Sequence, residues 1–204
     1  MLANRMRIML ASVVSDAQSA FIPGRAITYN IIISAEILHF LKRKRQGKHG
    51  CAALKIDMSK AYDRIEWKFL QAIMLKMGFP EKWVDLIMLC VSTVQYKVLR
   101  NGKEVGPIIP SRGLHQGDLL SPYLFILCAE GLSSLIRVNE KAGLIHGVKV
   151  ARSALMVSHL FFADDSFMFF RANQQEAVLM RNILASYSSC FWAKSKFQQI
   201  FDFV

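Results

Sequence analysis

The feature that most constrains this chain is residues 160–170, which read Leu-Phe-Phe-Ala-Asp-Asp-Ser-Phe-Met-Phe-Phe. Two apolar runs flank a short polar turn, a pattern typical of a β-hairpin with two neighbouring carboxylates, Asp164 and Asp165, at its tip. Adjacent carboxylates repel each other, and a divalent cation would supply the opposite charge. Asp and Ser are also common turn residues, so this turn alone favours an ordinary hairpin. A third aspartate, Asp57, at the end of another apolar run, shifts the balance toward a metal site.

Asp57 follows the run Cys-Ala-Ala-Leu-Lys-Ile of residues 51–56, which predicts a buried strand with the carboxylate just past its end. If this strand lies beside the hairpin, three carboxylates gather at one edge of a sheet. Such a cluster can hold two metal ions about 3.5–4 Å apart, which bridge an attacking oxygen and a phosphate.

Elsewhere, the sequence predicts an alternation of helices and short strands. Helices are expected over residues 1–14, 27–45, 59–77, 80–91, 121–140 and 174–188, with Ser59 and Ser121 as N-caps. Asn101-Gly102, between apolar runs at 95–100 and 104–109, predicts a second hairpin. Further strands are expected at 148–154, 155–162 and 167–171, and a glycine-bearing loop at 113–120. This mixture indicates an α+β domain.

The charge balance points to a polyanionic partner. The chain carries 26 Lys and Arg against 15 Asp and Glu, a net charge of +11, which favours nucleic acid over a membrane. No apolar run approaches the ~20 residues of a membrane span. The basic run Lys42-Arg43-Lys44-Arg45 is either a solvated helix end or a contact to a phosphate backbone, and both can hold together. Four cysteines without Cys-x-x-Cys spacing indicate reduced thiols in an intracellular protein.

Four sequence blocks, in this order, carry a family resemblance. They are Gln-Ser-Ala-Phe-Ile-Pro-Gly-Arg at 18–25, Lys-Ile-Asp-Met-Ser-Lys-Ala-Tyr-Asp-Arg at 55–64, Gly-Leu-His-Gln-Gly-Asp-Leu-Leu-Ser-Pro at 113–122, and Phe-Ala-Asp-Asp at 162–165. With them the chain resembles the reverse transcriptase domain of non-LTR (LINE-type) retrotransposons, plant members most of all. The resemblance implies a right-hand polymerase palm with partial fingers and no thumb. It divides the chain into partial fingers (about 1–50), a fingers and palm core (about 51–185) and a divergent tail (186–204).

The same resemblance implies an RNA-directed DNA polymerase, which adds deoxynucleotides to a primer 3′-OH on an RNA or DNA template. Its partners would be the primed template and deoxynucleoside triphosphates, with Mg²⁺ or Mn²⁺ as cofactor and no membrane. The positions of the catalytic, metal-binding acids are matched by Asp57, Asp164 and Asp165. Hard carboxylate oxygens suit Mg²⁺, and phosphoryl transfer depends mostly on positioning and charge neutralisation.

Nucleotide-binding positions of the family are matched by Tyr62, Gln116, Gly117 and Arg25. An aromatic ring at Tyr62 would clash with a 2′-OH and favour deoxynucleotides, although without the resemblance an ordinary half-buried helix tyrosine is the preferred explanation. Glycine at 117 allows close approach of the backbone. Arg25 could face triphosphate or template, or be a solvated turn arginine.

Departures from the family temper these expectations. His115 and Leu119 stand where the family usually has arginine and proline, and the residues after 185 diverge as if by a shifted reading frame. We therefore expect weak or no activity from this chain by itself. The alternative is a catalytically inactive retroelement remnant that at most binds nucleic acid. A nucleotidyl cyclase or other two-metal enzyme is a third interpretation, against which Tyr62 and Gln116-Gly117 argue. The expected location is intracellular, and nuclear for an active element.

Overall fold

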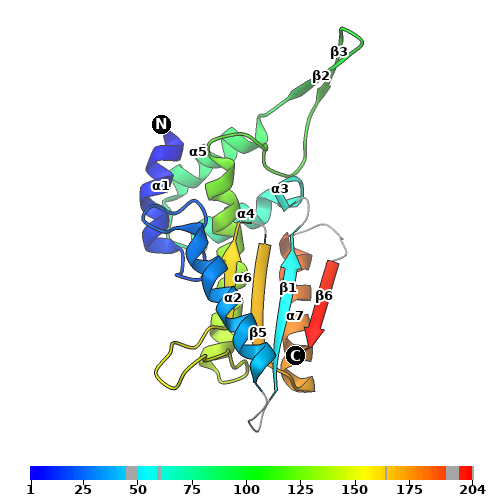
Figure 1. Ribbon diagram of the computed structural model, residues 1–204. Coiled ribbons are helices and arrows are strands. Elements are labelled where there is room, and N and C mark those ends of the chain that lie inside the picture. The colour runs from blue at the N-terminus through cyan, green and yellow to red at the C-terminus, as the bar shows by residue number, and fades with distance from the viewer. Residues whose placement is uncertain (45–49, 59–60, 164, 192–197, 204) are drawn as a thin grey trace.

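The fold is built on a four-stranded antiparallel sheet in the order β4-β5-β1-β6 (Figure 1). The computed structural model describes residues 1–44, 50–58, 61–163, 165–191 and 198–203. The strands of this sheet are β1 (Cys51–Asp57), β4 (His159–Phe162), β5 (Asp165–Arg171) and β6 (Gln198–Phe203). A separate two-stranded sheet pairs β2 (Tyr96–Arg100) with β3 (Lys103–Ile108). The α+β fold class predicted from the sequence is confirmed.

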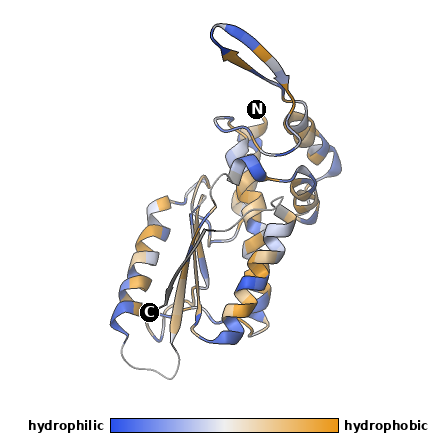
Figure 2. Cartoon of the chain, turned by 90° about the vertical axis from the view of Figure 1, so that its right-hand side faces the viewer, coloured by the Kyte–Doolittle hydropathy of each residue, from blue (hydrophilic) through white to orange (hydrophobic). Residues whose placement is uncertain are grey.

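Helices cover both faces of the sheet, which Figure 2 shows from its edge. The helices are α1 (Leu2–Val13), α2 (Ile27–Arg43), α3 (Ala61–Arg64), α4 (Trp67–Lys76), α5 (Glu81–Ser92), α6 (Ser121–Lys141) and α7 (Gln174–Phe191). One face of the sheet packs on the core that contains α6 and α7, and the other face packs on α2.

The two-sided packing follows from the residues of the strands. In β1, Leu54 and Ile56 belong to the core on the α6 side, whereas Ala53 joins Ile37 and Leu41 of α2 on the opposite side. Successive side chains of a strand point to opposite faces, so a strand covered on both sides must be apolar at nearly every position. The predicted buried strand before Asp57 is therefore confirmed.

Helix α6 is the central helix of the larger core. It is long and apolar enough to cross a membrane by length and composition, and most of that stretch is buried inside the fold. The sequence was expected to contain no apolar run near the length of a membrane span, and α6 differs from that expectation. Its burial is typical of a core helix. The helix begins one residue after Leu120, which takes the N-cap position predicted for Ser121.

Two other predictions were wrong. The single helix expected over 59–77 is broken into α3 and α4, because the backbone carbonyls of Tyr62 and Ile65 accept hydrogen bonds from Leu114 and Gly113 (2.7 and 2.8 Å). The strand expected at 148–154 is reduced to one antiparallel bridge between Val148 and Val157. Ser59, the predicted cap, lies outside the described residues.

The hairpin predicted at Asn101-Gly102 is confirmed. Both residues have positive φ angles (51° and 76°), the backbone that a two-residue turn between twisted strands requires. In Figure 1 this hairpin projects from the body of the molecule. In the predicted tail, α7 continues to Phe191 and β6 pairs with β1, while the domain boundaries drawn from the sequence stay predictions.

Candidate active site

Two of the three predicted catalytic aspartates lie opposite each other at one end of the sheet. Asp57 at the end of β1 and Asp165 at the start of β5 are direct partners in the antiparallel register. Such partners lie about 4.5–5.5 Å apart between Cα atoms, close enough for both side chains to reach one ion. Asp164 lies outside the described residues, so its convergence on this pair stays a prediction.

Lys55 supplies a positive charge to this pair, and sequence reasoning missed it. Its Nζ lies 3.3 Å from Oδ1 of Asp165, with about half of each side chain exposed. An ion pair this exposed contributes only about 0–1 kcal/mol to stability, so Asp165 remains available to another cation. The available signal was the spacing, because residues 55 and 57 of a strand share one face.

The donor chemistry of the site fits a hard divalent cation. Asp57 is exposed, and its side chain forms no hydrogen bond or ion pair with any other described residue. Within the described ranges, no cluster of three His, Cys, Asp or Glu side chains is positioned to hold a metal. Two carboxylates alone are a small ligand set, but Mg²⁺ commonly takes one or two carboxylates plus water and substrate oxygens.

The turn that precedes Asp165 is hydrogen-bonded to the N-terminal segment around Gln18. Ala163 has a φ of 58°, a conformation that costs a non-glycine residue energy. Its N–H points to Oε1 of Gln18 at 3.5 Å, and the same oxygen accepts the N–H of Ala20 at 2.9 Å. Gln18 also forms a parallel bridge with Phe161, so residues 17–19 lie along the outer edge of β4. The buried Gln18 Nε2 has no described partner.

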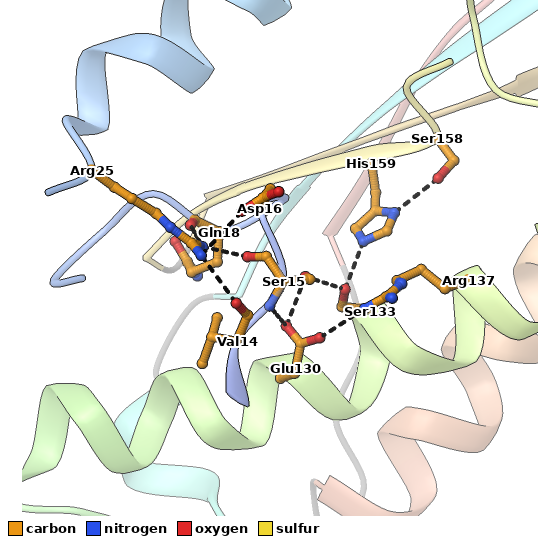
Figure 3. A network of polar contacts seen from close by, with 10 residues as sticks. All are labelled: Val14, Ser15, Asp16, Gln18, Arg25, Glu130, Ser133, Arg137, Ser158 and His159. Carbon is orange, nitrogen blue, oxygen red and sulfur yellow. Dashed lines mark hydrogen bonds and ion pairs between the residues drawn. The ribbon is translucent and has the colours of Figure 1, made fainter. Parts of the chain in front are cut away.

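Arg25 holds this segment in place (Figure 3). Its guanidinium donates to the backbone carbonyls of Val14, Ser15 and Gln18 and lies 3.1 Å from Asp16. With only 21% of the side chain exposed, it is not a solvated turn arginine. Its assignment to nucleotide binding stays a prediction, since the geometry directs the guanidinium at the protein's own backbone.

A buried polar network lies behind the same segment (Figure 3). Ser15 donates to Glu130 of α6, and Ser133 bridges Ser15 to Nε2 of His159 in β4. Burial lowers the pKa of His159 to about 4, assisted by the charge of Arg137. Burial also raises the pKa of Glu130, against the lowering effect of its hydrogen bonds and of Arg137. Sequence reasoning missed this network, because its members are far apart in the chain.

Tyr62 is half-buried and stacks on Phe125 of α6, with ring centroids 5.0 Å apart and planes inclined by 19°. The loop that carries Gln116 and Gly117 is hydrogen-bonded to α3, the helix of Tyr62, because the Tyr62 carbonyl accepts the Leu114 N–H. Gly113 is required at this junction, because its φ is 87° and a Cβ there would lie 2.8 Å from the Asp63 carbonyl oxygen. Thus the two predicted nucleotide-binding elements are held together.

A groove of about 1140 Å³ runs beside this loop. Gln116 and Asp118 line it, together with His115, whose ring lies 5.3 Å from that of Tyr96 at the base of the projecting hairpin. Asp57, Asp165 and Tyr62 do not line this groove, so the predicted site residues fall into two neighbouring groups rather than one pocket.

The basic run lies at the other end of the sheet. Lys42 and Arg43 are exposed at the end of α2, and Lys44 Nζ lies 3.3 Å from Sγ of Cys51, where β1 begins. The seven residues of β1 separate this end from Asp57, a span of about 20 Å at the usual rise. Arg45 lies outside the described residues. Nucleic-acid contact by this run stays a prediction.

Comparison with known proteins decides the family. The family model described as "Reverse transcriptase (RNA-dependent DNA polymerase)" matches residues 1–197. The chain belongs to the reverse transcriptase family. It is 28% identical to a Xenopus laevis transposon TX1 protein over 94% of this chain and 14% of that protein. It is also 26% identical to a Pol polyprotein of a Popillia japonica R2 retrotransposable element, over 62% of this chain and 20% of that protein. The resemblance drawn from the four blocks is confirmed.

A shorter match and the solved structures complete the comparison. Over 66 residues, the chain is 52% identical to an uncharacterized mitochondrial protein of Arabidopsis thaliana, covering 32% of this chain and 54% of that one. The fold matches a telomerase from Candida albicans with a TM-score of 0.66 and 12% identity, over 98% of this chain and 35% of that one. This reverse transcriptase chain therefore shares its fold with telomerase and spans between a seventh and about half of these relatives.

Proposed function

We propose that this chain carries the nucleotidyl-transfer centre of a retroelement reverse transcriptase, with Asp57, Asp164 and Asp165 as its acids. The observation that carries the proposal is the direct pairing of Asp57 with Asp165 at the end of the sheet, in a chain of this family. In the reaction, the primer 3′-hydroxyl oxygen bonds to the α-phosphorus of a deoxynucleoside triphosphate, and pyrophosphate leaves.

Different residues of the chain have different proposed roles in this reaction. Asp57 and Asp165, with Asp164, would hold Mg²⁺ or Mn²⁺, which neutralises charge on the phosphoryl group when bound. Lys55 offsets the repulsion between the carboxylates through its contact to Asp165. Gln18 restrains the turn through the Ala163 N–H, which supports a fixed position for the aspartates.

Substrate selection is assigned to Tyr62 and to Gln116-Gly117. Packing on Phe125 restricts the Tyr62 ring, and a ring that cannot move is a stronger barrier to a 2′-hydroxyl. We expect Tyr62→Ala to raise incorporation of ribonucleotides relative to deoxynucleotides, whereas Tyr62→Phe keeps the preference. The proposed partners are a primed RNA or DNA template and deoxynucleoside triphosphates, and the nuclear location of an active element is part of the same proposal.

Primer extension on poly(rA)/oligo(dT) with Mg²⁺ or Mn²⁺ tests the proposal. The chain is assayed by itself, where we expect little extension, and within a version lengthened at both ends by family-typical fingers and thumb. In the longer version, Asp57→Asn and Asp164→Ala should each lower the rate by at least about 10³-fold, the range found when a charge-neutralising group is removed.

The matched control is Asp85→Asn, which removes an exposed carboxylate from α5 and should leave the rate unchanged. Extension by Asp57→Asn at the rate of the unsubstituted protein would overturn the site assignment. If both versions bind nucleic acid but extend nothing, the chain is the inactive remnant considered above.

A further inference from the structure

The projecting hairpin β2–β3 is exposed along nearly its whole length and has no role in the proposed catalytic site. Only Tyr96, at its base, is half-buried, and the other residues of both strands are exposed. The hairpin rises from the end of the molecule toward which β1 runs to Asp57 (Figure 1). An extended ribbon with no core of its own is only marginally stable in water, which makes its side-chain pattern informative.

The register gives the hairpin two unlike faces. On one face Val98 pairs with Val105 and Arg100 with Lys103, and the register shifts between Val98 and Tyr96 at the base of the hairpin. The opposite face carries Lys97, whose Nζ lies 2.7 Å from Oε2 of Glu104. The charges of the second face are therefore balanced within the hairpin, whereas those of the first face are not.

Arg100 and Lys103 sit directly opposite each other beside the turn. Like charges at such positions destabilise a strand pair, and within the described part of the chain neither residue has an ion-pair or hydrogen-bond partner. Exposed cations at a hairpin tip also favour solubility, so the pair by itself does not identify a binding site. What distinguishes this pair is its place on a hairpin that begins at the groove beside the Gln116 loop.

The strand that carries Arg100 begins at the groove beside the Gln116 loop. Tyr96, the first residue of β2, and His115 line that groove, and their ring centroids lie 5.3 Å apart. Four residues of strand place Arg100 about 13 Å beyond Tyr96. A stacked nucleic-acid strand advances about 3.4 Å per nucleotide, so this distance corresponds to about four nucleotides.

We propose that the hairpin face formed by Val98, Arg100, Val105 and Lys103 binds a strand of nucleic acid that continues from the groove. The two cations contact phosphates, and the Tyr96 and His115 rings offer surfaces for base stacking, the combination found in sites for single strands. This inference rests on the proposed function for its partner. A second copy of the chain is a poorer occupant, because each copy carries a net charge of +11.

Fluorescence anisotropy with a labelled 20-nucleotide RNA, titrated with KCl, tests this surface in the full chain. We compare R100Q/K103Q with K82Q/K97Q, which removes the same charge from exposed sites on α5 and on the opposite hairpin face. Each lost phosphate contact on a single strand reduces the slope of log affinity against log salt by about 0.7. R100Q/K103Q should therefore lose about 1.4 of slope, and K82Q/K97Q clearly less.

Equal losses in both variants would mean that only net charge matters, and would overturn the assignment. Unchanged affinity in R100Q/K103Q, or no binding by the unsubstituted chain, would overturn it as well. Asp57→Asn separates this inference from the proposed function, because it should bind RNA like the unsubstituted chain whether or not extension is lost. Circular dichroism of each variant verifies that the fold is retained.

Discussion

The two hairpins of this protein start from similar sequence signals and end in opposite environments. Every residue of β4 is buried, and β5 lies between β4 and β1 in the main sheet. In contrast, β3 is exposed at all six positions and β2 at all but its first. Turn chemistry specified that both hairpins form, and side chains that are apolar on both faces placed one of them between two layers of helices.

This difference has a functional counterpart. The buried hairpin carries Asp165 against Asp57, with helices on both sides to restrict its movement. The exposed hairpin carries charged side chains where a large partner can reach them. A rigid element suits the placing of reacting groups within a fraction of an ångström, and an extended one suits contact with a long polyanion.

Core truncation should separate the hairpins most strongly. Phe169 of β5 is fully buried beside Ile37 and Leu41, so Phe169→Ala should lower the free energy of unfolding by about 3–5 kcal/mol. Leu99 of β2 is 73% exposed, and Leu99→Ala should change it by less than about 0.5 kcal/mol. Urea denaturation followed by circular dichroism measures both. A large loss for Leu99→Ala would show that the projecting hairpin packs on the body in solution.

Acid sensitivity should come from the buried hairpin. His159 in β4 has a pKa of about 4 in the folded protein, against 6.5 when unperturbed. Between these values the unfolded chain binds more protons, so the free energy of unfolding falls as pH drops through this window, by up to about 3 kcal/mol. Glu130 has the opposite effect on the free energy of unfolding, because a raised carboxyl pKa favours the folded state in acid.

His159→Gln tests this assignment, because glutamine retains a hydrogen-bonding side chain without the titration. The pH dependence of unfolding between about pH 6.5 and 4 should flatten in this variant. An unchanged slope would assign the acid sensitivity to other groups.

The turns should give the smallest effect. Ala163 in the buried hairpin has a φ of 58°, and Gly102 in the exposed one has a φ of 76°. Ala163→Gly should raise the free energy of unfolding by about 0.5–1 kcal/mol, because relief of the left-handed backbone outweighs the entropy of glycine. Gly102→Ala should disturb only the hairpin, seen as NMR shift changes confined to residues 96–108. Destabilisation by Ala163→Gly would show that the Ala163 methyl group makes a necessary contact.

Much of the local structure could be predicted from the sequence. The strand before Asp57, the hairpin at Asn101-Gly102 and the helices corresponding to α1, α2, α5, α6 and α7 follow from periodicity and turn residues, which act over a few neighbouring positions. The family also followed, since the four blocks retain their order.

The candidate site was predictable in part. The pairing of Asp57 with Asp165 was expected from two apolar runs that end in carboxylates. The contact of Lys55 with Asp165 was not predicted, because it depends on the register between two strands. The hydrogen bond of Gln18 to the turn was not predicted either, because Gln18 lies more than a hundred residues away in the chain.

The sequence by itself determined most of the helices, strands and turns, and to which family the chain belongs. Only the tertiary structure decided that Gly113 and Leu114 take the carbonyls that break the predicted helix, and that Arg25 turns to its own backbone. It also decided that the basic run of α2 and the cations of the β2–β3 hairpin lie at opposite ends of the molecule (Figure 1). The physical reason is that propensity is local, whereas the partner of a carbonyl or a charged side chain is chosen by which distant segments packing brings beside it.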